Sequence, residues 1–235
     1  MITFGGKLIL LDIEGTVSPL AFVHDMMFPY ARQRVDAFLS ANWDDAGVQA
    51  ALKQMAQDGG SRWENVQDLQ PFVVAEVHRL MDADVKATGL KLLQGLIWEE
   101  GFRTGELRSR IFEDVPHALA QWCRKGCDIR IYSSGSVHAQ KLFFAHTQRG
   151  DLSVHLSGCY DTTTGSKREA SSYASIAADC RLRANHILFV SDVADELDAA
   201  RTAGMFTALA IRPGNRSAPP HDHPVIHSFS EIEIA

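Results

Sequence analysis

The chain has 235 residues, of which 46% are hydrophobic and 22% charged, a composition typical of an ordinary globular protein and not of a disordered one. Its formal net charge of −6 argues against a broad nucleic-acid interface, which would need a basic face, but leaves room for a local phosphate-binding pocket. We find no secretory signal, no apolar run near the ~20 residues of a membrane span, and no zinc-type cysteine spacing. We therefore expect a cytoplasmic monomer with four free thiols and no membrane or nucleic-acid partner.

The first predicted element is a short buried strand at residues 8–11, which ends at Asp12. Four uninterrupted apolar residues are typical of a central parallel strand. Asp12 and Glu14 follow two residues apart, and Gly15 then allows backbone angles that other residues avoid. Open α/β sheets build their sites at the carboxyl ends of strands, and a buried Asp needs a partner or a metal. The pattern indicates a site, with an acidic turn of no function as the alternative.

The stretch from residue 24 to about 105 is predicted to be helical, because apolar residues recur at three- and four-residue spacings. Asp44-Asp45 is a helix-start signal, Gly59-Gly60 is a stop signal, Pro71 opens another run, and residues 90–102 form a further helix. An all-helical block after a single strand indicates an inserted domain. We expect this domain at residues 19–111, and a second one made of residues 1–18 and 112–235.

The remaining residues alternate between predicted strands and helices. Strands are expected at residues 129–132, 187–190 and 207–211, with weaker candidates at 154–156 and 159–160. Helices are expected up to Lys125 and at residues 137–147, 169–179 and 193–203. This alternation implies an α/β fold with a parallel sheet and right-handed crossovers.

Polar side chains follow the ends of these strands. Asp12 and Glu14 come after the first strand, and the later elements add Ser133, Ser134, Lys167 and Asp192. In a parallel sheet all of them emerge at one edge. The acids suit Mg²⁺, while the hydroxyls, the helix start after Ser136 and the lysine suit phosphate. A free carboxylate beside them can act as a nucleophile and form an acyl phosphate.

Each of these residues also has a purely structural interpretation. Asp192 could cap the helix that begins at residue 193, Ser133 and Ser134 could be turn and cap residues, and Lys167 could lie on the solvated surface. The joint pattern favours a site, because every motif follows the predicted element that it should follow.

The sequence resembles the haloacid dehalogenase (HAD) superfamily, whose four motifs match, in chain order, residues 12–16, Ser133, Lys167 and Asp192. Within it, the chain is similar to the enolase-phosphatase family of methionine salvage, whose members are acireductone synthases. The matching segments are residues 12–16, 22–25, 28–31, 95–101, 112–116, 131–136 and 212–215. The superfamily usually has Asp where this chain has Glu14, and Glu is the expected residue in the narrower family.

The resemblance implies a Rossmann-like HAD core at residues 1–18 and 112–235, a helical cap at 19–111, and one Mg²⁺ per chain. It implies a bifunctional enzyme that enolises 2,3-diketo-5-methylthiopentyl-1-phosphate and then dephosphorylates it to the acireductone. Asp12 would be the nucleophile, Glu14 the general acid, and Asp12, Glu14 and Asp192 the metal ligands. Ser133, Ser134 and Lys167 would hold phosphate.

Two other functions are compatible with the same motifs. One is a single-step HAD phosphatase or phosphotransferase that acts on another small phosphate ester. The other is a non-catalytic phosphate-binding protein on the same scaffold, which the usable groups at all four motif positions disfavour.

Several residues keep two interpretations at this point. The enolisation base could be Glu14, Glu99 or Glu100, although the last two could lie on a solvated helix face. Phe22, Phe28 and Trp98 could form an apolar wall for the methylthio group or belong to the cap core, and His24 and Asp25 could meet substrate or pack at the domain hinge. His221, His223 and His227 could bind a metal, but a mobile Pro-rich surface loop is the better interpretation.

Overall fold

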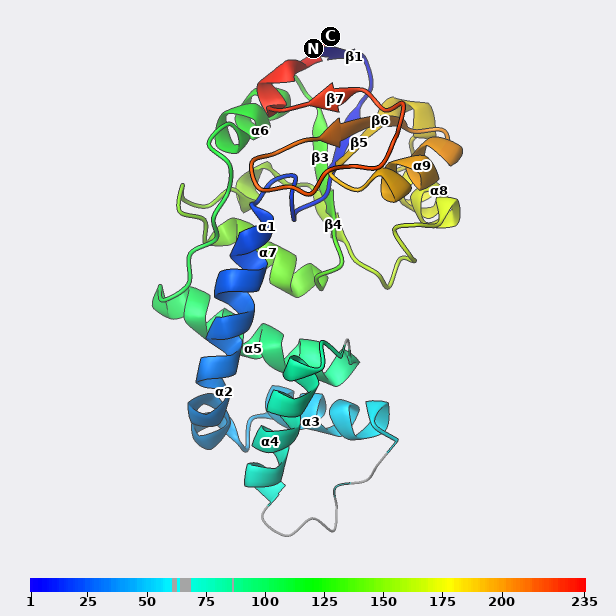
Figure 1. Cartoon of the computed structure of the whole chain (residues 1–235). Coiled ribbons are helices and arrows are strands. Elements are labelled where there is room, and N and C mark those ends of the chain that lie inside the picture. Colours follow the sequence, from blue (N-terminus) through cyan, green and yellow to red (C-terminus); the bar gives the residue numbers. More distant parts are fainter. Residues whose placement is uncertain (61–62, 64–68, 86) are drawn as a thin grey trace. The chain divides into compact units, whose positions relative to one another are not determined.

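The computed structural model describes residues 1–60, 63, 69–85 and 87–235. The chain divides into two compact units (Figure 1). One is made of Met1–Val23 and Arg108–Ala235, and the other is His24–Leu107. None of the helices in the described part of the chain is long and apolar enough to cross a membrane.

The first unit is built on a six-stranded sheet with the strand order β4-β3-β2-β5-β6-β7, in which all pairs are parallel. Its strands are β2 (Leu8–Leu11), β3 (Asp128–Tyr132), β4 (Gly158–Tyr160), β5 (Ile187–Ser191), β6 (Phe206–Ala210) and β7 (Val225–Ile226). The fully buried β2 lies at the centre between β3 and β5, as expected of an uninterrupted apolar strand. The predicted parallel α/β fold is therefore confirmed.

A second, two-stranded sheet joins β1 (Ile2–Phe4) to β8 (Ile232–Ile234) in parallel. The pairing brings the two ends of the chain together, and Figure 1 shows them side by side. Trp122 of α6 (Val115–Arg124) stabilises this end, because its ring lies 5.2 Å from that of Phe229 and its Nε1 donates to the carbonyl of Ile232.

The other helices of this unit are α1 (Leu20–Phe22), α7 (Val137–Ala145), α8 (Ala170–Asp179) and α9 (Ala194–Thr202), with 3₁₀ turns at Ser153–His155, Ala184–His186 and Phe229–Glu231. Helix α6 packs on β3, α7 on β4, and α9 on β5 and β6. Tyr173 of α8 and Leu197 of α9 share one apolar cluster with Leu8, Leu10 and Phe189 of the sheet. Burying this cluster fixes α8 and α9 on one face of the sheet.

Every secondary-structure element in the described part of the second unit is a helix. A π-helix at Val23–Met27 leads into this unit, and α2 (Phe28–Asn42), α3 (Ala46–Asp58), α4 (Leu69–Asp82) and α5 (Thr88–Thr104) follow. As the sequence predicts, Asp45 caps α3 by accepting from the amides of Gly47 and Val48, and Gly59 ends it. Gly89 lets α5 approach α3 closely, since a Cβ there would lie 2.2 Å from the Met55 nitrogen.

One strand prediction is wrong, and three short strands were not predicted. The 154–156 candidate is a 3₁₀ turn, because the Asp151 carboxylate accepts from the Ser153 amide, the Leu156 amide donates to the Ser153 carbonyl, and Val154 is exposed. Strands β1, β7 and β8 have only two or three residues each and were not expected, because such short segments carry no period.

Candidate active site

Strand β2 delivers Asp12 into a tight turn. The Asp12 amide donates to the Val190 carbonyl, which continues the β2–β5 ladder, and the Asp12 side chain is buried. Gly15 has a φ of 72°, which favours glycine. A Cβ on Gly15 would lie 2.2 Å from Asp192 Oδ2, so only glycine leaves room for that carboxylate. The turn after β2 and the end of β5 therefore meet through Gly15 and Asp192.

Lys167 joins this site as a buried cation. Its Nζ lies 2.5 Å from Asp12 Oδ1 and 2.6 Å from Glu196 Oε2, and the residue is only 9% exposed. The Tyr173 hydroxyl donates to the Lys167 carbonyl at 2.7 Å and holds the backbone of the loop. The surface interpretation of Lys167 is therefore wrong, and the structure brings Asp12 and Lys167 together across 155 residues of sequence.

The charges at this site are unbalanced. Burial opposes the charge of Lys167, yet the carboxylates of Asp12 and Glu196 raise its pKa above the ordinary value. Burial, and then the neighbouring carboxylates of Asp12 and Glu196, raise the pKa of Asp192 to about 7. The pKa of Glu196 is raised for the same two reasons, burial and the Asp12 charge, against the opposing effect of Lys167. One ammonium group thus faces several carboxylates.

Glu196 is the residue that the sequence reasoning missed. It lies in α9 and accepts from the Ser191 hydroxyl at 2.9 Å as well as from Lys167. The sequence signal that could have found it is its spacing: Glu196 comes four residues after Asp192, and residues four apart at a helix lie on the same side as each other. Asp192 itself is not the cap of α9, whose N-cap is Val193 without a side-chain cap bond.

Ser133 and Ser134 follow β3, the strand next to β2. Leu11 pairs in register with Ile131, so Asp12 and Ser133 leave the sheet at the same edge. Ser133 is buried and its hydroxyl accepts from the Gly135 amide at 3.5 Å, whereas Ser134 is exposed. Ser136 caps α7 as predicted, by accepting from the Ala139 amide.

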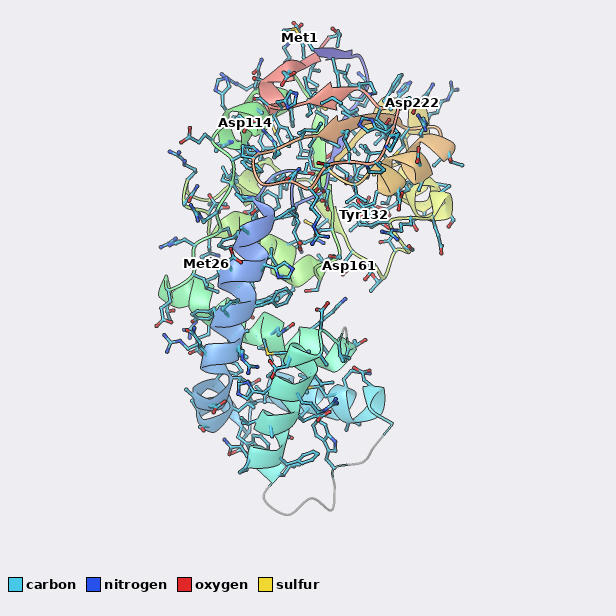
Figure 2. The ribbon with its side chains drawn as sticks, viewed as in Figure 1. Met1, Met26, Asp114, Tyr132, Asp161 and Asp222 are labelled. Carbon is cyan, nitrogen blue, oxygen red and sulfur yellow. The ribbon has the colours of Figure 1, made fainter. Side chains whose placement is uncertain are left out.

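The first turn of α7 has a carboxylate partner from another loop. The Val137 amide donates to Asp161 Oδ2 at 3.0 Å, so Asp161 occupies one donor at the N-terminus of α7. Figure 2 labels Asp161 and also Tyr132, the last residue of β3. Tyr132 holds the loop before Lys167, because its hydroxyl donates to the Gly165 carbonyl at 3.0 Å.

The expected metal ligands fit a hard cation. Asp12 and Asp192 provide carboxylate oxygens, and Glu14 lies in the turn after β2, where its backbone forms a β-bridge with Ser18. Within the described residues, no three His, Cys, Asp or Glu side chains form a ready metal cage. Mg²⁺ does not need one, since it is commonly held by one or two carboxylates, water and substrate phosphate. The surplus of carboxylates over Lys167 also fits a cation.

Comparisons with known proteins bear on these observations. The family model of haloacid dehalogenase-like hydrolases matches residues 7–204. Enolase-phosphatase E1 of Synechococcus elongatus is 46% identical over 231 residues, covering 95% of this chain and 96% of the relative. The protein of the same name from Aquifex aeolicus is 44% identical, covering 97% and 99%. The chain belongs to the enolase-phosphatase family of the haloacid dehalogenase-like hydrolases. The resemblance expected from the motifs is therefore confirmed.

Solved structures agree with this membership. The UTR4 protein from Saccharomyces cerevisiae is 34% identical with a TM-score of 0.82, and the match covers 96% of this chain and 99% of that one. CbbY from Rhodobacter sphaeroides, at 14% identity and a TM-score of 0.60, shares the fold. The HAD fold with its helical insertion is therefore established for this enolase-phosphatase family member.

Several expected residues lie in the helical unit. Trp98 donates from Nε1 to the Met27 carbonyl at 2.8 Å, and its ring lies 5.9 Å from that of Phe28. His24 and Asp25 are exposed on the π-helix, and Glu99 and Glu100 of α5 are partly exposed. Phe22, by contrast, is buried in the first unit, where its ring packs against Phe143. The structure thus assigns Phe22 to the core.

The C-terminal histidines do not share a solvated loop. His223 is buried and lies between the Thr207 hydroxyl, 2.9 Å from its Nδ1, and Asp198, 3.2 Å from its Nε2. Burial lowers its pKa. The ring of His221 stacks on it at 6.0 Å, and the backbone amide of His227 donates to Glu231. The surface-loop interpretation is therefore wrong for His223, which anchors the loop after β6.

Proposed function

We propose that this enzyme converts 2,3-diketo-5-methylthiopentyl-1-phosphate into the acireductone by enolisation followed by Mg²⁺-dependent phosphate hydrolysis. The name shared by the relatives at 40–46% identity supports the substrate. The observation that carries the chemistry is the buried Asp12 carboxylate, whose Oδ1 lies 2.5 Å from Lys167 Nζ at the carboxyl edge of the sheet. A buried carboxylate in this setting is a usable nucleophile.

The phosphatase step follows from these residues. An Asp12 carboxylate oxygen attacks phosphorus, the bond between phosphorus and the ester oxygen breaks, and Glu14 gives a proton to the departing oxygen. Water then attacks the aspartyl phosphate and gives a proton to the Glu14 carboxylate, the bond between phosphorus and the Asp12 oxygen breaks, and phosphate leaves with Asp12 and Glu14 restored. Lys167, Ser133 and Ser134 hold the phosphate oxygens during both transfers, with Lys167 offsetting their charge.

One Mg²⁺ per chain, held by Asp12, Glu14 and Asp192, would supply charge neutralisation at the phosphate and polarise the substrate carbonyl. The enolisation step requires a base that takes a proton from the carbon next to that carbonyl. Glu14, Glu99 and Glu100 are the three candidates. Glu14 lies in the turn after β2, and the other two lie in α5.

The test follows enol absorbance and inorganic phosphate together on a diketo-phosphate substrate, with Mg²⁺ and with a chelator. We expect both products from the wild type only with Mg²⁺, and no phosphate from Asp12→Asn. Enol that accumulates in Asp12→Asn would show that enolisation does not need the nucleophile. Release of phosphate from simple esters with the diketone untouched would instead favour a single-step phosphatase.

A further inference from the structure

The loop after β6 reaches back to the turn that carries Asp12 and Glu14. Asn215 Nδ2 donates to the Gly15 carbonyl at 2.8 Å and lies 3.2 Å from the Ala210 carbonyl. Because both neighbours are carbonyl oxygens, the side-chain nitrogen must face them. Arg212 Nε donates to the next carbonyl of the turn, that of Thr16, at 3.1 Å. Two consecutive peptide groups of the turn are therefore held by side chains about 200 residues later in the sequence.

Gly15 also lies against Asp192, one of the expected metal ligands, since a Cβ on Gly15 would fall 2.2 Å from Asp192 Oδ2. The Gly15 amide donates to the Ser18 carbonyl at 2.7 Å, which closes the turn on itself. Gly15 is therefore held between the Asn215 amide and the Asp192 carboxylate, and a shift of its peptide group would change how closely Asp192 approaches the turn.

The loop that carries Asn215 is itself firmly anchored. Arg212 is 5% exposed, and its Nη1 donates to Asp114 Oδ2 at 2.8 Å and to the His227 carbonyl at 2.9 Å. Its guanidinium carbon lies 4.8 Å from the Phe112 ring centre and 4.5 Å from that of Phe229. Figure 2 labels Asp114. Because Arg212 Nε and Nη1 are hydrogen-bonded and its guanidinium lies between two aromatic rings, the loop is anchored close to Asn215.

We propose that Asn215 is a positioning residue for the magnesium site. By holding the Gly15 carbonyl it fixes the turn against Asp192, and so sets the separation between the Asp192 carboxylate and the oxygens of Asp12 and Glu14. Asn215 does not touch substrate or metal, and it acts through the backbone of Gly15. The inference rests on the proposed Mg²⁺ site of the phosphatase reaction.

The test measures Mg²⁺ binding directly, by isothermal titration of MgCl₂ into the full-length protein, for the wild type and Asn215→Ala. We expect the Mg²⁺ dissociation constant to rise about tenfold, as is typical when a group that orients metal ligands is lost. Phosphate release should recover in Asn215→Ala at saturating Mg²⁺, because the reacting groups are all present. The matched control is Asn42→Ala, which removes an equivalent bond from an Asn side chain to the Phe38 carbonyl in the helical unit.

The outcomes separate this inference from the proposed function. If the wild type and Asn215→Ala bind Mg²⁺ equally well, with only the melting temperature lowered, Asn215 is merely structural and the inference is wrong. If the wild type itself binds no Mg²⁺, the proposed function fails first and the inference with it. Asn215→Gln keeps the amide but moves it by one methylene, and it carries the same test if Asn215→Ala does not fold.

Discussion

Glu196 Oε2 lies 2.6 Å from Lys167 Nζ, and Glu196 belongs to α9, which begins at Ala194, two residues after Asp192. Lys167 therefore has two carboxylate partners, Asp12 at 2.5 Å and Glu196 at 2.6 Å, which share its positive charge. Lys167 thus contacts Asp12 while it also forms an ion pair with Glu196. We expect Glu196 to weaken the ion pair between Lys167 and Asp12, so that the Asp12 carboxylate can react as a nucleophile.

Replacing Glu196 by Gln should slow phosphate release by roughly ten- to a hundredfold, in the range found for residues that orient ligand groups. The amide can still accept from Lys167 but no longer balances its charge, so Lys167 pairs more tightly with Asp12. Steady-state kinetics at saturating Mg²⁺ check this expectation. Glu113→Gln, which loses a charge in an exposed pair with Arg149, is the control. Equal rates in the two variants would contradict a role for Glu196.

Replacing Lys167 by Met should destabilise the protein by about 3 kcal/mol, because it leaves buried carboxylates without their cation. Lys167 is 9% exposed and contacts both Asp12 and Glu196, so solvent cannot compensate for the loss. Added Mg²⁺ should recover part of the free energy of unfolding by offsetting the same charges. Urea denaturation with and without Mg²⁺ measures both effects. A variant as stable as the wild type would show that the carboxylates are protonated or hydrated.

Replacing Gly15 by Ala should lower the affinity for Mg²⁺, and this loss should be larger than the loss in the free energy of unfolding. The new Cβ would lie 2.2 Å from Asp192 Oδ2 and must displace that carboxylate. Gly126→Ala is a matched control, because Gly126 has a φ of 78° and no atom within 4 Å of its added Cβ. Both variants carry a backbone penalty of about 1 kcal/mol.

Thermal denaturation and Mg²⁺ titration of these two variants separate strain from displacement. We expect similar losses of melting temperature from the backbone penalty and a loss of Mg²⁺ affinity in Gly15→Ala alone. Unchanged Mg²⁺ affinity in Gly15→Ala would mean that Asp192 takes no part in binding the metal.

The four cysteines should react slowly with a thiol reagent such as iodoacetamide at pH 7. Burial, and then the Asp128 carboxylate, raise the pKa of Cys127 to about 11, and burial also raises the pKa of Cys123, Cys159 and Cys180. Because the thiolate is the reactive form, the rate should rise about tenfold per pH unit above neutrality. Mass spectrometry counts the modified thiols. In urea all four thiols should be modified quickly, which serves as the control. A thiol that reacts as quickly in the native protein at pH 7 would contradict this expectation.

Sequence alone determined the parts of the protein that depend on local pattern. Hydrophobic period and turn chemistry predict the apolar strand β2 and the alternation of strands and helices. They also predict that polar residues follow the strands or precede a helix, as Asp12, Ser133, Lys167 and Asp192 do. These local patterns sufficed to predict the parallel sheet and the helical insertion, whereas the family was predicted from the resemblance of the motifs at residues 12–16, 133, 167 and 192.

Only the tertiary structure decided which of these side chains meet. Three contacts join segments that lie far apart in the sequence: Lys167 with Glu196, Gly15 with Asp192, and Asn215 with the Gly15 carbonyl. It also decided that His223 is buried against Thr207. Such contacts depend on the strand order, the register and the burial of the whole sheet, because a buried polar group takes whichever partner the packing brings within reach.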